Sequence, residues 1–274
     1  MCLIVFSWQP DSATPMVLLA NRDEFFERPA EPMHWWSDRP DVLAGRDLRG
    51  GGTWIGVNRA GRFAALTNFR DGRAPMTPKE TPSRGLLVSA MLDATSFDDD
   101  LKRIEKHAHE YAGFNLLAGD LPAGKLYWLG NRETSEVAGA AALPVAHAIS
   151  PGVHGLSNAL LDTPWPKLVS RRNALRDALD ANADDMTLLE AMRDATEAAD
   201  EALPHTGVTR EWERTLSAAF IASPAYGTRC TTLLRYFRDG TLELAESTVS
   251  PGQPANELRG LKRFRFALRP ATAV

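Results

Sequence analysis

Residues 1–25 read MCLIVFSWQPDSATPMVLLANRDEF, and this stretch decides the architecture. Two apolar runs, Cys2–Trp8 and Met16–Asn21, flank a short segment that contains prolines. Each run has the length and composition of a β-strand. A short connection predicts that the two strands pair antiparallel, so that the end of the second lies beside the start of the first. The polar residues 21–23 are therefore expected next to Cys2.

Cys2 follows Met1 directly and carries the chemistry that such a hairpin would support. Removal of Met1 would leave Cys2 with both a thiol and a free α-amine. The thiolate is the nucleophilic form of cysteine, and an α-amine with a pKa of about 7.7–8.0 is a suitable base near neutral pH. Cys2 is thus a candidate nucleophile that needs no histidine, and the scattered histidines indicate no Cys/His pair. The alternative is a small buried hydrophobic residue in an edge strand.

Composition narrows the class of protein. The 274 residues are 44% hydrophobic and 24% charged, as in ordinary globular proteins. The net charge of −4 disfavours a nucleic-acid-binding protein. No stretch approaches the roughly 20 apolar residues of a membrane span, and the N-terminus has no signal-peptide pattern. Cys2 and Cys230 make no disulfide framework, so we expect a cytoplasmic protein with reduced thiols. No cluster has zinc-like spacing, and no metal or other cofactor is expected.

Further strands and helices follow in blocks. Strands are expected at Thr53–Asn58, Arg62–Phe69, Phe114–Gly119, Lys125–Leu129, Ala146–Ile149, Val153–Ser157, Ala218–Ala222, Thr228–Arg238 and Thr241–Ser247. The turn sequences NRAG and RDG predict two hairpins among them. Helices are expected at Arg84–Leu92 after a Ser83 cap, Phe97–Tyr111 after a Ser96 cap, Pro166–Ala181, and Met186–Ala199 after an Asp184 cap. This order indicates a layered α+β fold, and no shift in composition divides residues 1–274 into domains.

Two asparagines follow apolar strand residues, Asn68 in ALTNF and Asn158 in GLSNALLD. Acyl transfer needs hydrogen-bond donors aimed at the developing oxyanion, and an asparagine amide can be one. The alternative is turn chemistry, in which asparagine is common.

The NRDE segment likewise allows a functional and a structural interpretation. Asp23 would hold the α-ammonium while Arg22 lowers the pKa of the thiol, or both would lie in a solvated ion pair at a strand end.

These segments together resemble a known family. The stretches MCLIVF, ANRDEFFERP, GGTWIGVNRAGRFAALTNFR, GLSNALLDTPWPK and YGTR look like the NRDE family, also called the transport and Golgi organisation family, from the N-terminus to about Thr232. Members are similar to the N-terminal-nucleophile (Ntn) hydrolases, in particular to the bile-salt hydrolase and penicillin V acylase group. The resemblance implies a four-layer αββα sandwich, in which helices flank two antiparallel sheets.

The resemblance also implies a role for each matching position. Cys2 takes the place of the nucleophile, Asp23 that of the carboxylate near the α-amine, and Arg229 that of a late arginine near the nucleophile. Asn68 and Asn158 take the places of the two oxyanion-hole asparagines.

One position departs from the acylase pattern. Ala20 stands where those enzymes carry an arginine before the Asn-x-Asp. Arg22 is no simple substitute, because in an extended strand it points away from its two neighbours. Asn21, Arg22 and Trp54 are the residues expected to contact a substrate.

Two functions stay open at this point. The first is an amidohydrolase that cleaves a non-peptide amide, or a related acyl bond, through Cys2. The second is a non-catalytic binder that uses the same pocket for haem, acyl-CoA or another lipid, because the family is linked to haem trafficking and lipid metabolism. A scaffold protein is a third interpretation. In the first two, the partner is a small-molecule substrate or a hydrophobic ligand.

Overall fold

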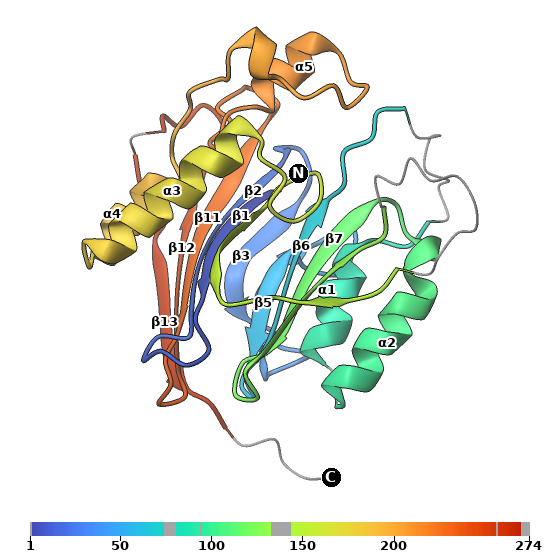
Figure 1. Ribbon diagram of the computed structural model, residues 1–274, viewed down its shortest axis with the longest axis vertical. Coiled ribbons are helices and arrows are strands. Elements are labelled where there is room, and N and C mark those ends of the chain that lie inside the picture. Colours follow the sequence, from blue (N-terminus) through green and yellow to red (C-terminus); the bar gives the residue numbers. More distant parts are fainter. Residues whose placement is uncertain (1, 74–80, 94, 133–143, 256, 270–274) are drawn as a thin grey trace.

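Two antiparallel sheets lie face to face, with helices on their outer faces (Figure 1). The computed structural model describes residues 2–73, 81–93, 95–132, 144–255 and 257–269. The first sheet has the strand order β10 (Gly152–Leu156), β1 (Cys2–Trp8), β2 (Met16–Phe25), β11 (Tyr226–Tyr236), β12 (Thr241–Thr248) and β13 (Lys262–Ala267). The second sheet has the order β3 (Ala30–Trp35), β4 (Val42–Asp47), β5 (Ile55–Asn58), β6 (Arg62–Asn68), β7 (Phe114–Asp120), β8 (Lys125–Gly130) and β9 (His147–Ala148).

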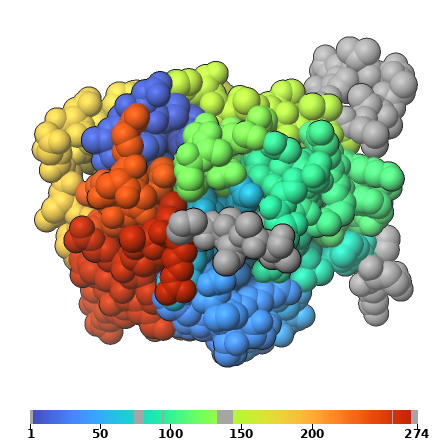
Figure 2. Space-filling view, turned by 90° about the horizontal axis from the view of Figure 1, so that it is seen from below, coloured from blue at the N-terminus to red at the C-terminus, as the bar shows by residue number. Residues whose placement is uncertain are grey.

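The helices form the two outer layers. α1 (Gly85–Leu92) and α2 (Phe97–His107) cover the second sheet, and a 3₁₀ turn, η1 (Ala108–Glu110), follows them. α3 (Pro166–Asp180) and α4 (Asp185–Ala191) cover the first sheet. The chain between α4 and β11 holds a 3₁₀ turn, η2 (Asp200–Ala202), and α5 (Arg210–Thr215). In the space-filling view, α3 and α4 in yellow and the C-terminal strands in orange and red lie on one side, and the green segment with α2 lies on the other (Figure 2).

The alternation of side chains along β1 shows why four layers form. Ile4 and Phe6 point between the two sheets, whereas Leu3 and Val5 pack against α3 and α4. Because successive side chains in a strand point to opposite faces, a strand buried on both faces needs a continuous apolar run. The expected αββα arrangement of two antiparallel sheets between helical layers is confirmed.

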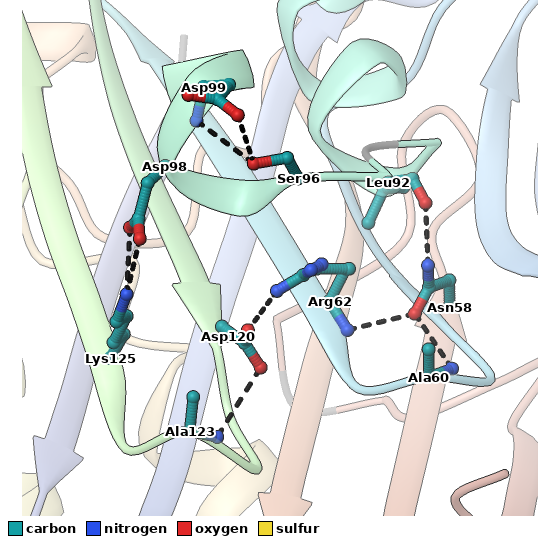
Figure 3. A network of polar contacts seen from close by, with 10 residues as sticks. All are labelled: Asn58, Ala60, Arg62, Leu92, Ser96, Asp98, Asp99, Asp120, Ala123 and Lys125. Atoms are coloured by element: carbon teal, nitrogen blue, oxygen red, sulfur yellow. Dashed lines mark hydrogen bonds and ion pairs between the residues drawn. The ribbon is translucent and has the colours of Figure 1, made fainter. Parts of the chain in front are cut away.

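The hairpin turns and caps bear out most of the local predictions. In the NRAG turn, Asn58 Oδ1 accepts hydrogen bonds from the backbone N–H groups of Ala60 and Arg62, each at 2.9 Å (Figure 3). The Ser96 side chain caps α2 by accepting from Asp99 N–H (Figure 3). Lys125 then ties β8 to the start of α2 through Asp98, at 2.7 Å (Figure 3).

Two predicted elements were wrong in whole or in part. Residues 218–222 form no strand apart from one bridge at Ala222, because the N–H of Phe220 donates to Asp194 and that of Ile221 donates to the Thr228 side chain. The Asp184 cap is confirmed, but α4 ends at Ala191. Asp194 Oδ1 accepts from Thr196 N–H at 2.9 Å, a local turn that competes with a helix.

The other differences concern helix ends and missed strands. The cap of α1 is Arg84 without a side-chain hydrogen bond, so Ser83 is not its cap. α2 ends at His107, where the chain tightens into η1. Strands β3, β4 and β13 were not expected. β2 continues to Phe25, because β11 pairs with it as far as Tyr226 opposite Phe25.

Candidate functional site

The register of β1 and β2 brings the predicted residues together at one end of the first sheet. Cys2 lies opposite Arg22, and Leu3 lies opposite Asn21. On its other side, β2 pairs with β11, which sets Asp23 opposite Thr228. The predicted proximity of Cys2 to residues 21–23 is therefore confirmed for the backbone. Met1 and the side chain of Cys2 lie outside what the structure describes.

Asn21 faces the helical layer and is fully buried. Its Nδ2 donates to the carbonyls of Met192 and Ala219, both at 2.8 Å, and its Oδ1 accepts from Thr231 Oγ1 at 2.8 Å. The amide thus joins β2 and β11 to the chain that follows α4. Asn21 is not among the residues that line the pocket described below.

Asp23 is also buried, at 1% exposure. Its Oδ1 accepts a hydrogen bond from Thr228 Oγ1 at 2.8 Å. Burial raises the pKa of Asp23 above its ordinary value, although the positive charge of Lys167 and the bond from Thr228 act in the opposite direction. A buried carboxyl group that titrates unusually is a typical feature of a functional site.

A small pocket opens where β2, the 47–54 loop, β6 and the start of α1 meet. Its cavity volume is about 90 Å³. The lining residues are Arg22, Asp23, Glu24, Arg28, Asp47, Thr53, Trp54, Leu66, Asn68, Ser83, Arg84 and Gly85. Four residues predicted for the site are among them. The pocket is strongly polar and carries charges of both signs.

Arg22 and Trp54 form one wall of this pocket. The guanidinium lies over the indole ring, 4.1 Å from its centroid, so a cation–π contact fixes its plane. The Trp54 ring in turn needs the glycine at position 45, since a Cβ there would meet the ring at 2.3 Å. Trp54 thereby holds Arg22 at the pocket while packing into the core between the sheets.

Asp47 forms the part of the wall next to Arg22. It accepts from Arg28 Nε at 2.8 Å and from the N–H groups of Arg49 and Gly50 at 3.0 Å. Burial alone would raise the pKa of Asp47, but these hydrogen bonds hold it below its ordinary value. The glycine-rich RGGGTW segment therefore supplies backbone donors to a carboxylate next to the pocket.

The two predicted oxyanion-hole asparagines are in contact. Asn158 Nδ2 donates to the backbone carbonyl of Asn68 at 2.9 Å, and Asn158 is fully buried. Arg70 fixes Asn158 through two hydrogen bonds. The backbone N–H of Arg70 donates to the Asn158 carbonyl at 2.7 Å, and its guanidinium donates to Asn158 Oδ1 at 3.3 Å. Only Asn68 lines the pocket. Within the described ranges, its side-chain amide makes no hydrogen bond.

Arg229 lies at the β-bulge of β11, between Thr228 and Cys230. Its Nη1 donates to the carbonyls of Phe25 at 2.8 Å and Arg28 at 3.0 Å, which ties down the turn after β2. Burial lowers the pKa of Arg229, and the positive charge of Arg22 lowers it further. Arg229 therefore lies near the pocket without lining it.

The comparisons with known proteins agree on the family. Residues 1–251 match the family model of Transport and Golgi organisation 2 (TANGO2). The chain belongs to the TANGO2 family. A Transport and Golgi organization protein 2 homolog from Bos taurus is 35% identical, over 97% of this chain and 99% of its own length. A homolog from Homo sapiens is 30% identical, over 91% and 93%. The predicted family is thus confirmed.

Solved structures resemble this TANGO2-family chain more distantly. A C2A mutant of a conjugated bile acid hydrolase from Clostridium perfringens is 13% identical with a TM-score of 0.47, over 97% of both chains. An N-acylethanolamine-hydrolyzing acid amidase ortholog from Caenorhabditis elegans is 7% identical with a TM-score of 0.41, over 85% of this chain and 92% of its own.

Sequence reasoning missed several residues of the pocket and its surroundings. Asp47 and Arg84 line the pocket from segments that carry no motif, and Arg28 lies in the ANRDEFFERP segment but was given no role. Behind Asn158, Arg70 forms a buried ion pair with Glu213, at 2.9 Å. Arg70 follows Asn68 in the TNFR segment, which was the one available signal. None of the helices in the described part of the chain is long and apolar enough to cross a membrane.

Proposed function

We propose that this TANGO2-family protein is an N-terminal-nucleophile hydrolase that cleaves a non-peptide amide or a related acyl bond, with Cys2 as nucleophile. The observation that carries the proposal is the register of Cys2 opposite Arg22. It brings the backbone of the candidate nucleophile to the pocket that Arg22, Asp23 and Asn68 line. One small polar pocket then holds a buried carboxyl group and an amide available for hydrogen bonding, next to a cysteine.

The proposed reaction begins with removal of Met1. The free α-amine of Cys2 accepts the thiol proton, and the thiolate attacks the substrate carbonyl carbon. The Asn68 amide donates to the oxyanion that forms, and Asn158 holds the Asn68 backbone in place. Collapse of the intermediate breaks the carbon–nitrogen bond, and the leaving amine takes the proton from the α-ammonium. Water then hydrolyses the thioester, which restores the thiol and releases the acid.

The neighbouring charges have supporting roles in this proposal. Asp23, a buried carboxyl group one residue beyond the partner of Cys2, holds the α-ammonium. Arg22 and Arg229 supply positive charge near the thiolate, which favours the charged form of a thiol. The reaction needs a reduced cysteine, so we place it in the cytoplasm.

The size and polarity of the pocket favour hydrolysis of a small molecule over carriage of a large ligand. Sites for drug-sized ligands typically enclose about 300–1,000 Å³ and are mostly apolar. The pocket here has a cavity volume of about 90 Å³ and is lined by charged side chains. A haem group or an acyl-CoA is therefore a poor match to the space that the described residues enclose.

Turnover by cysteine variants tests the proposal. Untagged wild-type protein, Cys2→Ala and Cys230→Ala are assayed against a panel of small N-acyl amides and thioesters. We expect turnover of at least one compound by wild type and by Cys230→Ala, and a loss of at least 1,000-fold in Cys2→Ala. Cys230 is a matched control, because it is the other cysteine of the chain. It lies on β11, opposite Arg22 of β2. Full turnover by Cys2→Ala would show the mechanism to be wrong.

A further inference from the structure

Arg22 is buried without hydrogen-bond acceptors. It is 5% exposed, yet none of its side-chain N–H groups makes a hydrogen bond in the part of the chain that the structure describes. Its one ion-pair contact there is with Asp47 Oδ2, at 3.9 Å, beyond hydrogen-bond distance. Burying a guanidinium costs free energy unless its donors are satisfied. The donors of Arg22 line the pocket, so the missing acceptors point to a ligand.

The acidic groups in the pocket wall already have other partners. Asp47 accepts from Arg28 and from two backbone N–H groups. Glu24 accepts from Phe25 N–H at 2.9 Å and lies 3.9 Å from Arg28. Asp23 accepts from Thr228 Oγ1. None of the three accepts a hydrogen bond from Arg22.

Arg229 and Asn68 also favour the binding of an anion beside Arg22. Arg229 lies close to Arg22. Burial lowers the pKa of Arg229 most, and the positive charge of Arg22 is the next largest cause that lowers it. Two neighbouring positive charges, one of them buried, favour a negative group beside them. Asn68 lines the same pocket with an amide that makes no hydrogen bond in the described ranges. Arg22 and Asn68 therefore offer donors from two strands, β2 and β6, to one small space.

We propose that Arg22, stacked on Trp54, binds a carboxylate of the substrate, so that the substrates of this site are small amides or acyl compounds that carry a carboxylate. This assignment rests on the proposed hydrolase function for its substrate, but the carboxylate site itself does not. The planar guanidinium can bind a carboxylate through two parallel hydrogen bonds. The register of Arg22 opposite Cys2 then holds the reacting carbonyl close to the bound carboxylate. The small cavity selects for short acyl or amine groups.

Two fluorinated probes of equal shape test the carboxylate site. Difluoroacetate is an anion at neutral pH, and difluoroacetamide is its neutral counterpart. Their binding is followed by ¹⁹F NMR titration of the Cys2→Ala protein, which lacks the proposed nucleophile. We expect saturable binding of difluoroacetate at least tenfold tighter than that of the amide. Absence of saturable difluoroacetate binding, or equal binding of both probes, would overturn the assignment.

Matched variants locate the binding at Arg22. Arg22→Gln should weaken difluoroacetate binding at least tenfold and leave amide binding unchanged. Arg22→Lys keeps the charge without the planar fork, so it should lose part of the affinity and serves as the folding control. Arg49→Gln removes an exposed arginine of the neighbouring loop and should change nothing. An equal loss in Arg22→Gln and Arg49→Gln would mean general charge attraction and would contradict the proposal.

The two proposals fail in distinguishable ways. If Cys2→Ala keeps full turnover while Arg22 still binds difluoroacetate, the nucleophile is wrong and the carboxylate site is correct. If Cys2 proves essential while Arg22→Gln binds both probes as the parent protein does, the hydrolase is correct and the substrate class is wrong.

Discussion

Asn158 donates a hydrogen bond of 2.9 Å to the backbone carbonyl of Asn68, although 90 positions separate the two residues in the sequence. Asn68 ends β6 of the second sheet, and Asn158 follows β10 of the first. The contact therefore links the two sheets beside the pocket. It fixes the backbone of Asn68 and does not involve the Asn68 side chain, which belongs to a residue that lines the pocket.

Replacing Asn158 should damage both stability and activity. Asn158→Ala removes the donor to Asn68 and leaves the Arg70 guanidinium without its Oδ1 neighbour. Leaving a buried polar group unsatisfied costs about 1–3 kcal/mol. We expect that loss in the free energy of unfolding by urea denaturation, with at least a tenfold loss of turnover. Asn173→Ala, at an exposed position of α3, is the control and should change neither. Unchanged turnover in Asn158→Ala would mean that Asn68 needs no support from it.

The buried ion pair of Arg70 and Glu213 holds the α5 segment against the site. Glu213 also accepts from the N–H of Thr206 at 2.7 Å. Removing one partner of a buried pair costs about 3–5 kcal/mol, because the other charge is left uncompensated. Urea denaturation of Glu213→Ala should show that loss, whereas Glu211→Ala, an exposed residue on the same helix, should cost under about 0.5 kcal/mol. Equal losses of unfolding free energy in the two variants would show that the Arg70–Glu213 pair does not stabilise the fold.

The segment that carries Asn158 should have a pH-dependent anchor. His154 Nδ1 lies 2.7 Å from Asp162 Oδ2, and this hydrogen bond raises the pKa of His154 above 6.5. Burial alone would raise the pKa of Asp162, but bonds from His154 and Gly155 hold it below 3.8. A raised histidine pKa stabilises the fold fully below pH 6.5, and this contribution is lost as the pH rises through the folded-state pKa. The lowered aspartate pKa contributes above pH 3.8 and is lost in acid.

The pair should thus stabilise the fold most between those two pH values. We expect the free energy of unfolding of His154→Gln to fall below that of wild type by more at pH 5.5 than at pH 9, in urea titrations at both pH values. His109→Gln, at an exposed position, is the control. A difference between wild type and His154→Gln that does not change with pH would contradict this account.

The sequence was most informative where apolar runs and short turns act locally. The runs in residues 1–25 predicted the first hairpin, and with it the place of Cys2 opposite Arg22. NRDE was expected at a strand end, yet it lies inside β2, because β11 pairs with it from the far end of the chain. A pairing between residues 21 and 231 leaves no local pattern. Strand β3 was missed because Pro32 and polar neighbours interrupt its alternation, and its bulge lies at the same place.

For the site too, contacts between distant segments could not be predicted from the sequence. The family resemblance led to Asp23, Asn68 and Trp54, which all line the pocket. It gave no reason to expect Asp47 or Arg84, which reach the pocket from the end of β4 and the start of α1. Because Ala20 stands where the acylases carry an arginine, the sequence left the role of Arg22 undecided. Its burial without acceptors became visible only once Trp54 and Asp47 were placed around it.

The most direct test of the central claim is the intact mass of untagged protein purified from its native host. The Ntn mechanism requires the α-amine of Cys2 to be free, because that amine is the base. We predict a mass that is short by one methionine, with Cys2 as the first residue. A mass that retains Met1 would lock the amine in a peptide bond and contradict the proposed mechanism.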